Sequence, residues 1–297
     1  MTKNKVIVIA GPTAVGKTAL SIELAQQYGG ELINGDSQQV YRGVEIGTAK
    51  ATAAEQAAAQ HHLIDVRDLS ETFSAYDFVQ AANQAIKTIL ARGKVPIIVG
   101  GTGLYLQSLI EGYHLGGSGQ HEQMRALREV LAQLTDAQLF DKVAEQGITL
   151  AEPNRRRAIR ALEIATYGEQ LENQASSDEF LILGLNAERQ VLYSRINQRV
   201  DEMMAAGLLA EARLLHEQFR ESQVARAIGY KEFFPYFDGR LSLEAAVEAV
   251  KRNSRRYSKR QLTWFKNRMA VDFEDVLAAD FKIRVTQKIE RFLNDNN

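Results

Sequence analysis

The chemistry most readily predicted from this chain lies near its start, in a glycine-rich run that matches the pattern G-x-x-x-x-G-K-[ST]. Its members are Gly11, Pro12, Thr13, Ala14, Val15, Gly16, Lys17 and Thr18. In such a P-loop the backbone N–H groups form a concave anion site, and the following helix adds the partial positive charge of its N-terminus. Lys17 supplies a full positive charge and Thr18 a hydroxyl ligand for Mg²⁺. The run predicts binding of a diphosphate or triphosphate group; a glycine-rich turn without a ligand is the structural alternative.

One carboxylate is the best candidate for chemistry beside this anion site. P-loop nucleotide hydrolases hold Mg²⁺ with an acidic residue that commonly follows another apolar strand, yet the apolar run ending at Val99 continues into Gly100, Gly101 and Thr102. Asp36 follows a shorter apolar run, ELIN at 31–34. It would therefore reach the same edge of a parallel sheet as the P-loop. Asp36 is expected to act as a metal ligand or as a base, unless it only caps a turn or a helix.

Positive charge is concentrated in two segments, although the formal net charge of the chain is only −1. The first segment opens a predicted helix, where basic charge opposes the helix dipole and so favours an anionic partner. The second has no acid between Glu248 and Asp272, and its spacing of four residues forms a stripe on a helix. Such a stripe indicates a solvated face or contact with nucleic-acid phosphates. The residues are Arg155, Arg156, Arg157 and Arg160 in the first segment, and Lys251, Arg252, Arg255, Arg256, Lys259, Arg260, Lys266 and Arg268 in the second.

Two arginines and three histidines are the remaining polar candidates. Arg195 and Arg199 are four residues apart on a predicted helix, and either could clamp an anion or form a surface salt bridge. His61, His62 and His114 lack the spacing of a metal site and are interpreted as structural. The chain has no cysteine, which excludes disulfides and thiolate chemistry. It also lacks an apolar run of about 18 residues or more, so we expect a cytoplasmic protein without a membrane partner.

Short apolar runs alternate with helical patterns, and these elements must position the polar residues. Strands are predicted at 5–10, 31–34, 94–99 and 180–185, and helices at 17–28, 75–91, 104–109, 189–204, 208–219 and 241–267. This alternation predicts an α/β fold, with a P-loop NTPase-like parallel sheet flanked by helices. A glycine-rich run at 115–119 leads into purely helical periodicity at 124–134, 136–146 and 156–167. We therefore predict a core formed by residues 1–114 and 179–297, interrupted by a small all-helical insertion at 115–178.

Eight motifs together resemble a known family. They are GPTAVGKT (11–18), NGDSQQVYR (34–42), IGTAK (46–50), HHLID (61–65), VGGTGLY (99–105), RRAIRALE (156–163), RAIGYKE (226–232) and RYSKRQLTWFKNR (256–268). The first motif is common to many P-loop proteins, but the set occurs in order over nearly the whole chain. It is similar to the tRNA dimethylallyltransferases, which prenylate an adenosine beside the anticodon.

The resemblance implies transfer of the dimethylallyl group of dimethylallyl diphosphate to N6 of the adenosine 3′ of the anticodon, in tRNAs that read codons beginning with U. Diphosphate leaves with the help of Mg²⁺, and the helical insertion grips the anticodon stem-loop. Asp36 matches the general base, Thr102 a residue that contacts the target nucleotide, and Arg199 a diphosphate-binding arginine; Lys17 and Thr18 complete the catalytic set. The positions that match tRNA contacts are Asp36, Ser37, Gln38, Gln39, Thr102, Arg125, Arg156, Arg157, Arg160, Arg226, Gly229, Tyr230 and Lys231.

Three other functions are weighed against this one. A prenyltransferase acting on free AMP or ADP shares the P-loop, Asp36 and Thr102, but it does not need the insertion or the basic helices. A small-molecule kinase would bind ATP through the same motif and transfer its phosphate. An RNA-binding module without catalysis leaves the co-occurrence of Lys17, Thr18 and Asp36 unexplained. The protein is expected to work as a monomer.

Overall fold

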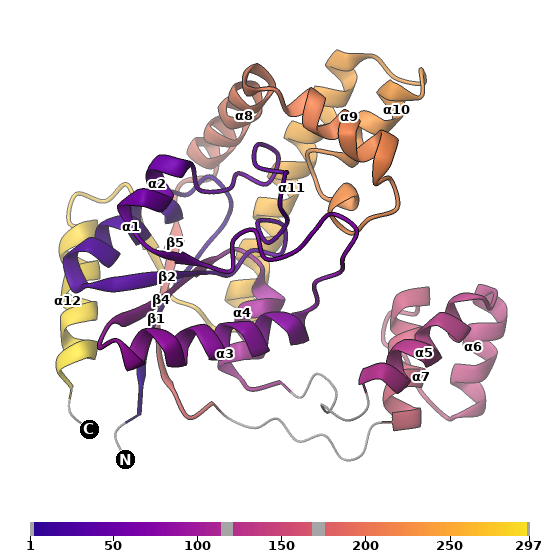
Figure 1. The fold of residues 1–297 in the computed structure, drawn as a ribbon, viewed down its shortest axis with the longest axis horizontal. Helices are drawn as coiled ribbons and strands as arrows, with labels where there is room; N and C mark the ends of the chain where they lie inside the picture. The colour runs from indigo at the N-terminus through magenta and orange to yellow at the C-terminus, as the bar shows by residue number, and fades with distance from the viewer. Residues whose placement is uncertain (1–2, 114–120, 168–175, 296–297) are drawn as a thin grey trace. The chain divides into compact units, whose positions relative to one another are not determined.

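The structure is a computed structural model that describes residues 3–113, 121–167 and 176–295 (Figure 1). Six strands form one sheet in the order β3-β2-β4-β1-β5-β6, and all neighbouring strands run parallel. The predicted α/β fold is therefore confirmed. The strands are β1 (Lys5–Ala10), β2 (Gly30–Asn34), β3 (His61–His62), β4 (Val95–Gly100), β5 (Glu179–Asn186) and β6 (Phe273–Asp275).

The chain divides into two compact units, and the sheet belongs to the first, Met1–Ile110 with Ser176–Asn297. Its helices are α1 (Lys17–Tyr28), α2 (Ala53–Ala58), α3 (Ala75–Ala91), α4 (Gly103–Ile110), α8 (Arg189–Ala206), α9 (Leu208–Gln218), α10 (Phe234–Phe237), α11 (Leu243–Arg268) and α12 (Phe281–Asn294), with 3-10 turns at Val224–Arg226 and Lys231–Phe233. Within the described ranges, the structure contains no helix that is both long and apolar enough to cross a membrane.

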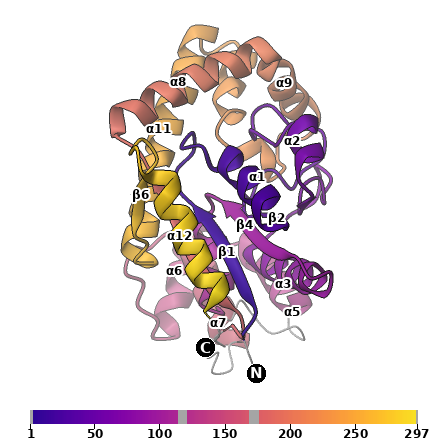
Figure 2. The same cartoon turned by 90° about the vertical axis from the view of Figure 1, so that its left-hand side faces the viewer.

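Successive side chains of the central strand pack on opposite faces of the sheet. Val6 and Val8 of β1 belong to a buried cluster that includes side chains of α3 and α4, whereas Ile7 and Ile9 belong to a second cluster with α1 and α12. Figure 2 shows α12 lying along β1 on this second side. A strand that is buried on both faces needs a continuous apolar run. The run KVIVIA meets this requirement, which is why the strand could be predicted.

Five strands and helices of the first unit, β3, β6, α2, α10 and α12, were not predicted from the sequence, and neither were its two 3-10 turns. The helix α10 has only four residues. The strands β3 and β6 contain only two and three residues, too few for a period of two to be visible. The helix α2 has no buried residue and therefore lacks an apolar face. By contrast, α12 buries Phe281, Val285 and Ile289 at intervals of four, a helical signal that is present in the sequence.

The second unit, Glu111–Ala175, consists of α5 (His121–Ala132), α6 (Asp136–Glu145) and α7 (Arg155–Tyr167). Leucine, valine and alanine side chains from these helices form a small buried cluster. Glu163 is fully buried beside it, and the Arg128 guanidinium donates to both carboxylate oxygens at 2.6 and 2.9 Å. The predicted glycine-rich run at 115–119, residues 172–175 of the polar stretch that follows the helices, and His114 lie outside the described residues.

Three neighbouring strands bring their carboxyl ends together at one edge of the sheet. The P-loop follows β1, Gly101 and Thr102 follow β4, and Asp36 lies two residues after β2. The loops approach closely, because the Gly35 N–H donates to the Val99 carbonyl at 2.7 Å and a Cβ on Gly100 would overlap the backbone of Gly35. Ligands of parallel sheets bind outside such an edge.

Candidate active site

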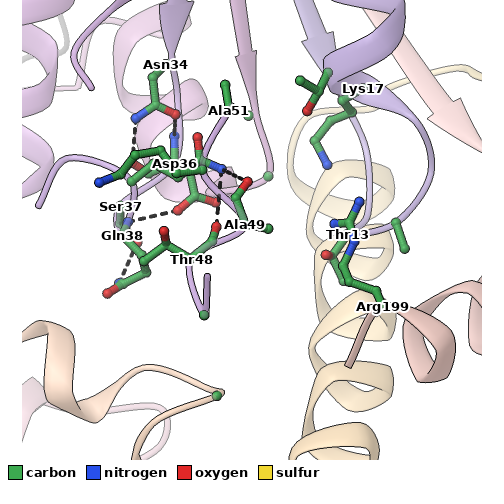
Figure 3. Close-up of a pocket in the computed structure, with 18 of the residues that line it drawn as sticks. Thr13, Lys17, Asn34, Asp36, Ser37, Gln38, Thr48, Ala49, Ala51 and Arg199 are labelled. Atoms are coloured by element: carbon green, nitrogen blue, oxygen red, sulfur yellow. Dashed lines mark hydrogen bonds between the residues drawn. The ribbon is translucent and has the colours of Figure 1, made fainter. Parts of the chain in front are cut away.

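A pocket of about 640 Å³ opens at this edge of the sheet, entirely within the first unit. Figure 3 shows Lys17, Thr13 and Arg199 on one side of it and Asp36, Ser37 and Gln38 on the other. The predicted site residues that line it are Thr13, Ala14, Gly16, Lys17, Thr18, Asp36, Ser37, Gln38, Gln39, Arg199, Arg226, Gly229 and Lys231. Arg195, the alternative to Arg199, is exposed and lies outside the lining.

The P-loop connects β1 to α1 in the strand–helix setting that its motif requires. Gly16 precedes α1 with a φ of 103°, a conformation that favours glycine. The Lys17 ammonium donates to the carbonyls of Gly11 and Pro12 at 3.0 and 2.8 Å. Lys17 is thereby folded over the loop whose N–H groups would hold an anion.

Lys17 and Arg199, two of the cations that line the pocket, form no ion pair with any of the described residues. Burial lowers the pKa of the Lys17 ammonium to about 8, an effect that Asp36 opposes and Arg199 adds to. Burial also lowers the pKa of the Arg199 guanidinium. Both charges are destabilised by loss of water, so a multivalent anion in this part of the pocket would stabilise them.

Asp36 lies in a tight turn that fixes its carboxylate. Its N–H donates to Asn34 Oδ1 at 3.0 Å, and its Oδ1 accepts from the Gln38 N–H at 2.8 Å. The next N–H, of Ser37, donates to Thr102 Oγ1 at 3.1 Å. Thr102 is therefore in contact with the Asp36 turn, although it does not line the pocket itself.

The environment of Asp36 makes its carboxylate a stronger base than an exposed one. Burial raises the pKa of Asp36, while the hydrogen bond from Gln38 and the charge of Lys17 oppose the shift. The turn interpretation from the sequence is therefore correct for its hydrogen bonds, but it does not exclude a chemical role.

Residues of the segments 47–51 and 226–231 form a further side of the pocket. Glu211 on α9, which was not predicted from the sequence, holds these two segments together. Its carboxylate accepts the N–H groups of Glu45, Ile46 and Gly47, and also the Tyr230 hydroxyl at 2.8 Å. The Tyr230 ring lies so close to Gly47 that a Cβ there would overlap it. Glu211 thus joins the IGTAK motif to the RAIGYKE motif. Tyr230 is fully buried in this junction and does not line the pocket.

The basic stripe of α11 is divided between structural and exposed positions. Lys251 pairs with Asp201 at 2.7 Å, and Arg255 donates to Asn197 at 2.6 Å, so both hold α11 against α8. The exposed positions are Arg252, Arg256, Lys259, Arg260, Lys266 and Arg268. The two interpretations from the sequence, a solvated face and a phosphate-binding face, therefore apply only to the exposed set.

The arginines of the second unit also differ in their local roles. Arg155 pairs with Asp136 at 2.7 Å and Arg157 with Glu152 at 2.6 Å, whereas Arg160 contacts the buried Glu163 at 3.1 Å. Arg156 is exposed on α7. The side chain of Arg125, on α5, lies outside what the structure describes.

The histidines take part in local contacts of the core. His61 Nδ1 lies 2.7 Å from the Ala59 carbonyl, and His62 Nε2 lies 2.7 Å from Glu31 Oε2. Across the described part of the chain, no three His, Cys, Asp or Glu side chains form a metal-binding group. Both contacts agree with the structural interpretation of these residues.

A P-loop facing a fixed carboxylate is an arrangement suited to an enzyme that acts on a phosphate or diphosphate ester. The chain belongs to the IPP transferase family, whose model matches residues 39–268. A tRNA dimethylallyltransferase of Lactococcus lactis subsp. lactis is 64% identical over 294 residues, covering 99% of this chain and 100% of that protein.

Solved structures are similar over the same extent. The crystal structure of a tRNA isopentenylpyrophosphate transferase from Bacillus halodurans matches with a TM-score of 0.74 and 43% identity, covering 98% of each chain. A eukaryotic dimethylallyltransferase acting on tRNA matches with a TM-score of 0.85 and 30% identity, covering 99% of this chain and 80% of that one.

The lowered pKa of Lys17 predicts a pH dependence of diphosphate binding. Below pH 8 the ammonium is charged, and its attraction for the anion is lost as the pH rises through about 8. At pH 9 only about a tenth of the free protein keeps this charge, so affinity should fall roughly tenfold more in the wild type than in Lys17→Arg between pH 7 and 9. Calorimetric titration with inorganic diphosphate measures both proteins; the titration of diphosphate itself cancels in the comparison. Parallel profiles would contradict the assignment.

Proposed function

We propose that this protein transfers the dimethylallyl group from dimethylallyl diphosphate to N6 of the adenosine 3′ of the anticodon, in tRNAs that read codons beginning with U, and releases diphosphate. The observation that carries the proposal is the division of one pocket into an anion-binding side, with Lys17 and Arg199, and a side with the Asp36 carboxylate. Membership of the IPP transferase family supports it.

The anion-binding side fits a diphosphate leaving group. Negative charge develops on the diphosphate as the allylic C–O bond breaks, and donors that are already in place stabilise that charge most effectively. The P-loop N–H groups, Lys17 and Arg199 are such donors. The Thr18 hydroxyl lines the same pocket and suits Mg²⁺, which prefers a few protein oxygens together with substrate phosphates and water. When bound, Mg²⁺ would neutralise part of the diphosphate charge.

The carboxylate side fits removal of a proton from the acceptor amine. The lone pair of adenine N6 is delocalised into the ring, so the neutral amine is a weak nucleophile and a very weak acid. Its N–H becomes acidic only as the C–N bond forms, and a fixed carboxylate can then accept the proton. The raised pKa of Asp36 improves its ability to do so.

The acceptor must reach this pocket as a base that has left its stack. We propose that Ser37, Gln38, Gln39 and the lining residues of the segment 226–231 surround the base, with Thr102 holding the Ser37 N–H. The helical insertion and the exposed basic face of α11 would hold the stem-loop phosphates. Every lining residue comes from the first unit, and we propose that the protein acts as a monomer.

The decisive experiment is incubation of the protein with an anticodon stem-loop, Mg²⁺ and dimethylallyl diphosphate, without ATP, followed by mass spectrometry of the nucleosides. We expect one added dimethylallyl group on the adenosine 3′ of the anticodon. Faster modification of free AMP or ADP than of the stem-loop would favour the nucleotide prenyltransferase. A requirement for ATP with phosphate transfer would favour the kinase.

Asp36→Asn keeps the shape of the side chain and its bond to the Gln38 N–H but removes the base. We expect turnover to fall by about 10²-fold or more, the usual contribution of a general base, while the Kd for inorganic diphosphate changes little. Single-turnover kinetics at saturating substrates measures the chemical step. A rate equal to that of the wild type would exclude Asp36 as the base.

Replacement of Arg156 and Arg157 by alanine tests phosphate contact by the insertion. Their loss should weaken stem-loop binding and reduce the slope of log Kd against log salt by about one for each phosphate contact. Arg160→Ala is the comparison variant for thermal stability. Because it removes a contact with buried Glu163, it should lower the melting temperature of the unit, whereas the double variant should not. An unchanged salt slope in the double variant would show that these two residues do not touch phosphate.

A further inference from the structure

One buried side chain connects the two loops on which the reaction depends. Gln261 of α11 is only 5% exposed. Its Oε1 accepts the Thr13 N–H of the P-loop at 2.9 Å, and its Nε2 donates to the Gly101 carbonyl, after β4, at 2.9 Å. The amide therefore uses an acceptor on one loop and a donor on the other, and it fixes the spacing between them.

The neighbouring residues are adapted to this connection. A Cβ on Gly101 would overlap Gln261 Nε2, so glycine is required for the amide to approach. One turn earlier on α11, Tyr257 lies close to Thr102 and Gln261, and both side chains oppose the rise that burial causes in the pKa of Tyr257. Thr102 Oγ1 in turn accepts the Ser37 N–H. A series of contacts therefore leads from Tyr257 on α11, through Thr102, to the turn that holds Asp36.

The Thr13 bond also bears on how a diphosphate is held. An N–H that donates to Gln261 is directed away from an anion in the loop, so the cradle must rely on the remaining N–H groups, Lys17 and Arg199. Gln261 thus contributes no charge to the diphosphate and can act only through the position of the loops.

We propose that Gln261 is a positioning residue, which holds the P-loop and the segment 101–102 at the separation needed to align the breaking C–O bond with Asp36 and the acceptor amine. This inference rests on the proposed function. It assigns to α11 a role in the chemical step, in addition to the exposed basic face that the same helix presents.

The test is Gln261→Leu, which keeps the volume of the side chain but removes both hydrogen bonds. Misalignment by about an ångström can cost 10²-fold in rate, and we expect a fall in kcat of that order. The Kd for inorganic diphosphate should stay within about threefold of the wild type, because only the transition state needs the alignment. Equal falls in kcat and diphosphate affinity, or a kcat within about twofold of the wild type, would overturn the proposal.

Three further variants make the result specific. Gln107→Leu removes another buried glutamine, on α4 and outside the pocket, and it should lower thermal stability without changing kcat. Gln261→Glu keeps the acceptor for Thr13 but loses the donor to Gly101; it should lower kcat even if the leucine variant does not fold. Gly101→Ala should reproduce the loss by displacing Gln261, so Gly101→Ala with Gln261→Leu should cost little more than either change alone. Additive losses would contradict a shared contact.

The wild-type protein in the same assay separates the two proposals. If the wild type does not modify the stem-loop, the proposed function fails. If it does and Gln261→Leu matches its rate, only the role of Gln261 fails.

Discussion

Two half-buried cations that face one pocket set the main electrostatic constraint on this protein. Lys17 and Arg199 lose hydration there, and the pKa of each is lowered as a result. Such a cost is tolerated where a ligand anion replaces the lost water. Asp36, on the other side of the pocket, cannot supply that compensation without giving up its own role, because a carboxylate paired tightly with a cation becomes a weaker base. The separation of the cations from Asp36 is therefore what the surrounding loops must maintain.

The sheet and the anion site could be predicted from local sequence patterns. The strands β1 and β4 are buried on both faces, so their apolar runs were visible, and the P-loop needs glycine and lysine at fixed intervals. Asp36 was a candidate because of its place after an apolar run, and Arg199 because of its helical spacing from Arg195. The family resemblance added Thr102 and favoured Arg199 over Arg195. Glu211 gives no comparable signal, because a glutamate on an amphipathic helix resembles any solvated position. Its bond to the Gly47 N–H spans 164 residues of sequence, and only the folded chain shows that it joins two motifs.

The basic segments show a related limit of sequence reasoning. The absence of an acid between Glu248 and Asp272 suggested uncompensated charge, yet Lys251 is paired with Asp201 on the neighbouring helix. In α7, the run of arginines opens the helix, but Arg160 reaches a glutamate that is fully buried. A count of charges along one element cannot separate residues that stabilise the fold from those available to a polyanion. That distinction requires the burial and the ion-pair partners that only the folded chain shows.

The arrangement of α11 explains how one helix can serve both substrates. Val250, Tyr257 and Gln261 lie on the face that lines the pocket, whereas Arg252 and Arg256 are exposed. A helix of 26 residues moves as a unit, since its hydrogen bonds run along its whole length. Under the proposed function, the helix that presents cations to the RNA phosphates would also carry Gln261, whose side chain holds the P-loop. One continuous element would then contact the acceptor and support the loop that holds the donor.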